Sequence, residues 1–101
     1  MDFGIRENLN KPVNHKTLED ALIEAAKETG LKLKERKKGV SENEGGTKTI
    51  LYFGRKMSRA MEVVIQYHGD LTDFFRVYPD GWFGASEKTI KSYASRVHNY
   101  L

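Results

Sequence analysis

The chain has 101 residues, a length typical of one domain that buries a single core. It contains no cysteine, which excludes disulfide frameworks, thiolate metal sites and cysteine nucleophiles. Its 17 lysines and arginines barely exceed its 14 acidic residues, so the distribution of charge says more about function than the total. No window is apolar enough for a membrane span or a signal peptide, and we expect a cytoplasmic protein without a membrane partner.

The N-terminal residues carry scattered apolar side chains that are interrupted by asparagine, glycine and Pro12. Because they show no sustained period, we expect an irregular arm at 1–16, followed by a single α+β domain at 17–101. Thr17 is a candidate N-cap, after which apolar residues recur at helical spacing until Gly30. This pattern predicts a first helix over residues 17–30.

The period changes to two after the first predicted helix. Leu31 and Leu33 alternate with basic residues as far as Arg36, which predicts a strand with one buried face and one solvent-exposed face. A strand this polar is typical of a sheet edge. Residues 39–46 are rich in glycine and acidic residues, and this composition predicts a mobile loop.

Three further strands follow the predicted loop. Residues 47–54 are β-branched and aromatic on both faces, as is typical of an inner strand. A short basic connection at 55–59 leads to a strand over 60–68, and a fourth strand ends at Pro79.

The hairpin between the last two strands has two alternative registers. A two-residue loop at Gly69 would bury Arg76 in the core, whereas a loop of three or five residues places Phe75 and Val77 there. We therefore expect an odd loop. The opposite face then carries Phe74, Arg76 and Tyr78 beside Val64, Gln66 and His68.

The last element is a helix that Ser86 is expected to cap. One stripe of this helix carries Ile90, Tyr93, Ala94, Val97 and Leu101. Trp82 is expected to plug the junction between sheet and helix. The element order α-β-β-β-β-α predicts a two-layer α+β sandwich, an antiparallel meander sheet with both helices on one face.

Basic residues gather on the predicted edge strand and on the connection at 55–59. They are Lys32, Lys34, Arg36, Lys37, Lys38, Arg55, Lys56 and Arg59. Release of counterions from phosphates favours such a cluster, which makes nucleic acid the natural partner. The alternative is that lysines on an edge strand prevent pairing with another sheet.

The face that carries Phe74, Arg76 and Tyr78 combines aromatic rings with cations. This combination is typical of surfaces that bind single-stranded nucleic acid. Protein interfaces are enriched in the same residue types. A third alternative is that a helix or the N-terminal arm covers this face.

We therefore expect a non-catalytic module that binds single-stranded nucleic acid or RNA through the basic edge strand and the aromatic face, without cofactor or metal. The alternative is a protein–protein interaction or homodimerisation domain that uses the same face. A third hypothesis is a small-ligand binder or enzyme near His68 and Asp73, where an imidazole and carboxylates lie close in sequence. No nucleophile motif or dinucleotide-type glycine loop accompanies them.

Overall fold

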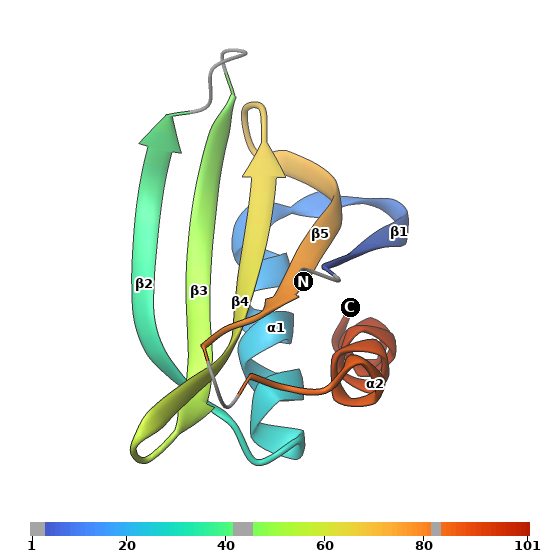
Figure 1. The fold of residues 1–101 in the computed structure, drawn as a ribbon. Helices are drawn as coiled ribbons and strands as arrows, with labels where there is room; N and C mark the ends of the chain where they lie inside the picture. The colour runs from blue at the N-terminus through green and yellow to red at the C-terminus, as the bar shows by residue number, and fades with distance from the viewer. Residues whose placement is uncertain (1–3, 42–45, 82–83) are drawn as a thin grey trace.

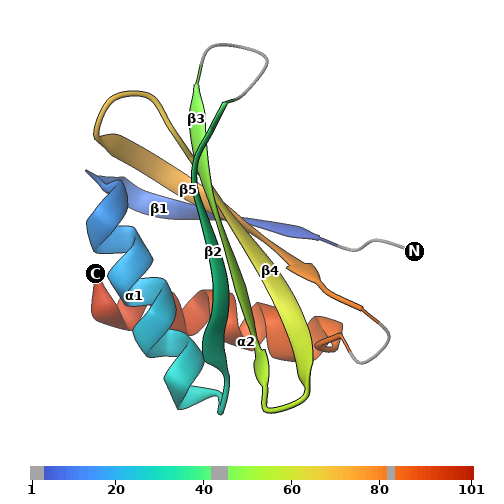
Figure 2. The same ribbon diagram turned by 90° about the vertical axis from the view of Figure 1, so that its left-hand side faces the viewer.

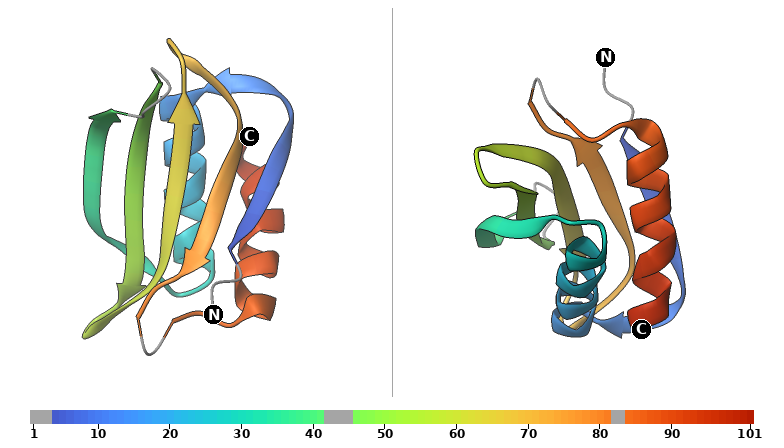
Figure 3. Two further views of the ribbon diagram at one scale, coloured as in Figure 1. Left: turned by 45° about the horizontal axis from the view of Figure 1, so that its top comes forward. Right: turned by 90° about the horizontal axis from the view of Figure 1, so that it is seen from below.

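The structure, a computed structural model, describes residues 4–41, 46–81 and 84–101. Its elements are β1 (Ile5–Asn14), α1 (His15–Glu28), β2 (Lys32–Ser41), β3 (Thr47–Arg55), β4 (Ser58–Tyr67), β5 (Leu71–Pro79), α2 (Glu87–Val97) and a short 3-10 helix η1 (His98–Tyr100). In these residues, five antiparallel strands form one sheet in the order β1-β5-β4-β3-β2 (Figure 1). Both helices pack on the same face of the sheet, where α2 crosses α1 (Figures 2 and 3). The predicted α+β sandwich with a meander sheet and one-sided helices is confirmed.

The N-terminal segment contains a strand, and the prediction of an irregular arm over 1–16 is wrong. β1 forms an edge of the sheet, with Ile5 opposite Val77 and Asn8 opposite Phe74 of β5. The pairing shifts between Asn8 and Val13, so the two halves of β1 follow different registers. Half-buried and exposed residues still alternate from Ile5 to Asn10, but the half-buried Glu7 is polar, so the sequence shows no sustained apolar period of two there.

Helix α1 begins directly after β1, two residues before the predicted start. Asn14 is the N-cap, and its side chain accepts a hydrogen bond of 2.8 Å from the backbone N–H of Lys16. Thr17 therefore lies within the first turn of the helix rather than at its cap. The predicted end is confirmed, because Gly30 follows the helix with a φ of +79°.

Strand β2 forms the other edge of the sheet, as predicted, and β3 lies between β2 and β4. β2 extends beyond the predicted 31–36 and takes in residues 39–41 of the predicted loop, with Ser41 opposite Thr47. The rest of the predicted mobile segment includes 42–45, which lie outside the described residues. Pairing between β2 and β3 shifts twice, between Leu33 and Glu35 and again between Lys37 and Val40.

The faces of β4 and β5 are sorted as predicted. Val63 lies opposite Val77 on the helix-covered face, and Val64 lies opposite Arg76 on the other face. The predicted odd loop is nevertheless wrong, because a bridge between His68 and Leu71 closes a two-residue turn. A shift of pairing between this bridge and the Val64–Arg76 pair restores the register that keeps Arg76 out of the core.

Helix α2 is capped by Ser86, whose hydroxyl accepts a hydrogen bond of 3.2 Å from the Thr89 N–H. The predicted stripe is buried through Val97, but Leu101 lies beyond the helix and is 43% exposed. Trp82, the predicted junction plug, lies outside the described residues. The buried residues of both helices share one core with those of β3, β4 and β5.

Tyr93 joins the two helices, and replacing it with phenylalanine is expected to cost about 1 kcal/mol of stability. The Tyr93 hydroxyl is buried and donates a 2.8 Å hydrogen bond to the Leu22 carbonyl of α1. Burial also raises the pKa of this hydroxyl well above its ordinary value of 10.0. Above that value the unfolded chain loses the Tyr93 proton while the folded chain keeps it, so stability falls as pH rises.

Urea unfolding of wild type and Tyr93→Phe, at neutral pH and above the ordinary tyrosine pKa, checks both parts of this expectation. The variant should be less stable at neutral pH and should lose less stability than wild type on going to alkaline pH. An equal alkaline loss in both proteins would contradict the assignment of the effect to Tyr93.

Candidate functional site

The open face is the face of the sheet opposite the helices, and its side chains follow the strand pairing in three rows. The first row contains Glu35, Tyr52, Glu62 and Tyr78. The second contains Lys37, Ile50, Val64, Arg76 and Arg6. The third contains the opposed pairs Lys48 with Gln66 and Asn8 with Phe74. The left view of Figure 3 shows that neither of the two helices described crosses this face.

A shallow groove of about 460 Å³ lies on the open face over β3, β4 and β5. It is lined by Lys48, Glu62, Val64, Gln66, Arg76 and Tyr78, together with Pro79. Backbone pairing between β4 and β5 joins 61–64 to 76–79. Beyond that stretch, side chains connect the two strands, since a guanidinium nitrogen of Arg76 donates a 2.9 Å hydrogen bond to Gln66 Oε1. Arg76 is therefore held at the groove in a defined position.

Cations lie over two of the three aromatic rings on the open face. The Arg6 guanidinium carbon is 3.9 Å from the centroid of Phe74, and that of Arg59 is 4.1 Å from the centroid of Tyr52. Arg59 also forms an ion pair with Glu35. Among the described residues, no cation lies over Tyr78, whose ring packs against the backbone of Gly4.

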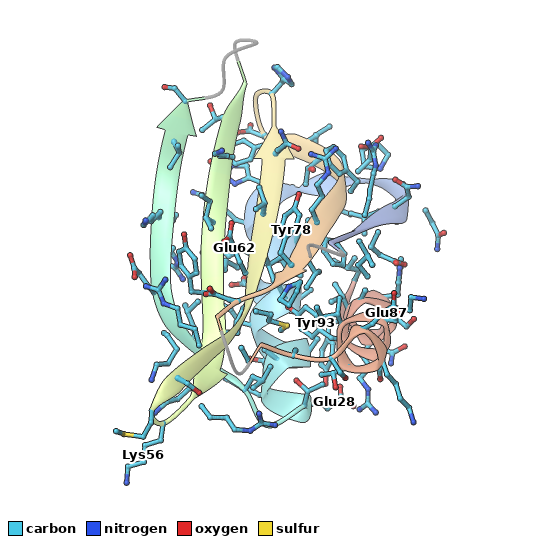
Figure 4. All side chains as sticks on the ribbon, in the orientation of Figure 1. Glu28, Lys56, Glu62, Tyr78, Glu87 and Tyr93 are labelled. Carbon is cyan, nitrogen blue, oxygen red and sulfur yellow. The ribbon has the colours of Figure 1, made fainter. Side chains whose placement is uncertain are left out.

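The basic edge strand and the β3–β4 turn meet at one end of the sheet. The ammonium group of Lys34 donates hydrogen bonds to the carbonyl oxygens of Arg55 (2.9 Å) and Lys56 (3.1 Å). This contact brings three of the predicted phosphate-binding residues together. Lys32 and Lys38 are exposed on β2, on either side of this contact along the strand. Figure 4 shows Lys56 projecting from the tip of the turn.

Arg36 does not share a face with Lys32 and Lys34, and the predicted stripe of these three residues is wrong at this position. The irregularity between Leu33 and Glu35 adds a residue, so Arg36 lies opposite Leu51 on the helix-covered face. There its Nε is 2.6 Å from Oε1 of Glu19, a carboxylate of α1 whose side chain is only 5% exposed. Lys37 takes the place on the open face that Arg36 was expected to fill.

The predicted residues Phe74, Arg76 and Tyr78 do lie together on the open face. The sequence does not point to Arg6, because β1 carries no strand signal that would place this residue on the sheet. Tyr52 and Glu62 were also missed as site residues, although the alternation within the predicted strands 47–54 and 60–68 already placed them on this face.

His68 and Asp73, the third candidate site, are both exposed near the β4–β5 turn. At the preceding residue, the ring of Tyr67 stacks on that of His15, with ring centroids 3.9 Å apart. Within the part of the chain that the structure describes, no group of three or more His, Asp or Glu side chains is placed to hold a metal ion.

Comparison of the chain with protein-family models, with curated proteins and with solved structures finds no match. Neither helix in the described ranges combines the length and the apolar character that a bilayer-spanning helix needs. The geometry and charge of the open face are therefore the features that indicate a function.

Proposed function

We propose that the protein binds single-stranded nucleic acid or RNA across the open face of the sheet. The observation that carries this proposal is that cations and aromatic rings lie together on one surface that neither described helix covers. The cations are Arg6, Lys37, Lys48, Arg59 and Arg76, and the rings are those of Phe74 and Tyr78, whereas Tyr52 is only 8% exposed beneath Arg59. Cations attract backbone phosphates and rings stack on bases, so together they favour an unpaired strand.

The dimensions of the sheet suit an extended oligonucleotide. Neighbouring strands lie about 4.8 Å apart, so five strands give a face roughly 19 Å wide. At one side of this face, the contact between Lys34 and the β3–β4 turn adds Arg55 and Lys56 to the basic surface. A nucleic-acid strand that crosses the sheet along the second row would meet Arg6 and Arg76 on β1 and β5 and Lys37 on β2, with Val64 and Ile50 between them.

The prediction is a salt-dependent affinity for single strands. For a single strand, log K falls with log salt by about 0.7 for each phosphate neutralised. Arg76→Gln and Lys37→Gln should each weaken binding of a labelled oligouridine and reduce this slope by about 0.7. Lys91→Gln, which removes a cation from α2 on the other side of the molecule, is the matched control and should change neither quantity. Fluorescence anisotropy at several salt concentrations gives both values.

The competing hypothesis of a protein–protein or homodimerisation surface has a different signature in the same samples. Light scattering across a concentration series measures the mass of the free protein. A mass that doubles with concentration, with no oligonucleotide bound at low salt, would contradict the proposal and assign the open face to self-association. Salt-independent binding would contradict it as well, because phosphate contacts release counterions.

A further inference from the structure

Glu62 places a carboxylate in the middle of the otherwise basic open face. It lies on β4 between Tyr52 of β3 and Tyr78 of β5, and it lines the groove (Figure 4). The side chain is partly buried, yet among the described residues its carboxylate has no hydrogen-bond or ion-pair partner. Glu35, the other carboxylate in this row, is paired with Arg59.

An unpaired carboxylate is unfavourable on a surface that only follows phosphates, because it repels them. It is favourable where a ligand presents hydrogen-bond donors, since an ionised carboxylate has two acceptor oxygens and no donor. In single-stranded nucleic acid such donors are found on the Watson–Crick edges of the bases. The position of Glu62 therefore indicates a contact with a base edge rather than with the backbone.

The four bases differ in what they offer to a carboxylate. Guanine presents two adjacent donors, N1–H and N2–H, which match both oxygens of one carboxylate. Adenine and cytosine each place a ring-nitrogen acceptor beside their amino donor, and uracil flanks its single N–H with two carbonyl acceptors. Only guanine satisfies both Glu62 oxygens without facing an acceptor toward them.

The groove supplies the other contacts that a guanine needs. Tyr78 lies directly opposite Glu62 on the neighbouring strand, at the cross-strand separation of about 5 Å that lets two side chains act on one ligand. Arg76 lies one row away and lines the same groove, with its guanidinium held by Gln66 beside the ring of Phe74. We propose that the groove recognises an unpaired guanine that stacks on Tyr78 and directs its Watson–Crick edge to Glu62. This inference rests on the proposed binding of single-stranded nucleic acid.

The test compares a labelled oligouridine with the same oligomer carrying one central guanosine. The guanosine oligomer should bind roughly tenfold more tightly, as is typical of a bidentate side-chain-to-base contact. Replacing guanosine with inosine, which lacks the 2-amino group, should remove part of that gain. Glu62→Gln should abolish the preference while oligouridine binds at least as tightly as before, because a repulsive charge has been removed. Glu87→Gln removes the same charge from α2, away from the groove, and should keep the full preference (Figure 4).

The outcomes separate this inference from the proposed function. Equal, salt-dependent affinity for both oligomers would overturn the guanine site and leave single-strand binding in place. A guanosine preference that survives Glu62→Gln would also overturn it. Failure of wild type to bind either oligomer would overturn the proposed function and this inference with it. Circular dichroism of each variant, which should match wild type, ensures that a lost preference reflects the groove and not the fold.

Discussion

Replacing Arg36 with glutamate is expected to destabilise the fold by about 3 kcal/mol, although the residue lies on an exposed edge strand. Its guanidinium is the partner of Glu19, whose side chain is buried against the sheet with 5% exposure. The substitution would leave that carboxylate unpaired and bring a second negative charge against it. The estimate is at the lower end of the range for buried pairs, because Arg36 itself is 38% exposed and solvent screens part of the interaction.

The matched control for this substitution is Lys37→Glu, the same change of charge at the next residue. Lys37 lies on the open face, opposite Ile50, so its replacement should alter stability by less than about 0.5 kcal/mol. Urea unfolding measures both variants. The double variant Glu19→Gln with Arg36→Gln, which leaves neither charge unpaired, should recover much of the loss. Equal stability of Arg36→Glu and Lys37→Glu would show that the Glu19 pair does not hold β2 to α1.

This difference between neighbouring residues matters for any test of binding. A charge reversal at Arg36 would change oligonucleotide binding partly by destabilising the domain, whereas a reversal at Lys37 acts on the surface alone. Lys37 on the open face is thus the informative basic residue of β2, and Arg36 is a structural one.

Much of the fold could be predicted from sequence because the local signals agree with the packing. Ser86 precedes a stripe of apolar residues at helical spacing, and α2 begins where that pattern predicts. The alternation in β4 and β5 assigned Val64 and Arg76 to one face, because the opposite assignment would have buried an arginine. Such patterns predict an element correctly when its apolar residues follow one period, either helical or alternating, along its whole length.

The predictions failed where a strand changes register. β1 pairs in two segments separated by a shift, and its half-buried side includes the polar Glu7 between Ile5 and Leu9, so the sequence shows no run of apolar residues at a period of two. In β2 the irregularity after Leu33 moves Arg36 to the helix-covered face, where the buried Glu19 neutralises it. A shift of this kind depends on which partner strand is adjacent, and that information is tertiary. The alternation of Lys32, Lys34 and Arg36 in sequence could not reveal it.

The second large effect is expected at Gly54, where replacement with alanine should lower the free energy of unfolding by about 3 kcal/mol. Gly54 is buried on β3, and a Cβ built there would lie 2.6 Å from the Arg59 Cα and would overlap the Ser58 carbonyl oxygen. Both are backbone atoms of β4, so no side chain can move aside to relieve the contact. The β3–β4 turn would have to shift, and the carbonyls of this turn would move away from Lys34.

Gly39→Ala is the control for this substitution, because it tests backbone conformation without crowding. Gly39 has a φ of +69°, and a Cβ there meets no atom within 4 Å. Its replacement should lower the stability of the fold by only about 1 kcal/mol, the cost of placing a side chain in the left-handed region. Urea unfolding followed by circular dichroism ranks the two variants. If Gly39→Ala lowered stability as much as Gly54→Ala, the close approach of β4 to Gly54 would not explain the position of the turn. If the expected order is found, the position of Arg55 and Lys56 beside Lys34 depends on the absence of a side chain at Gly54.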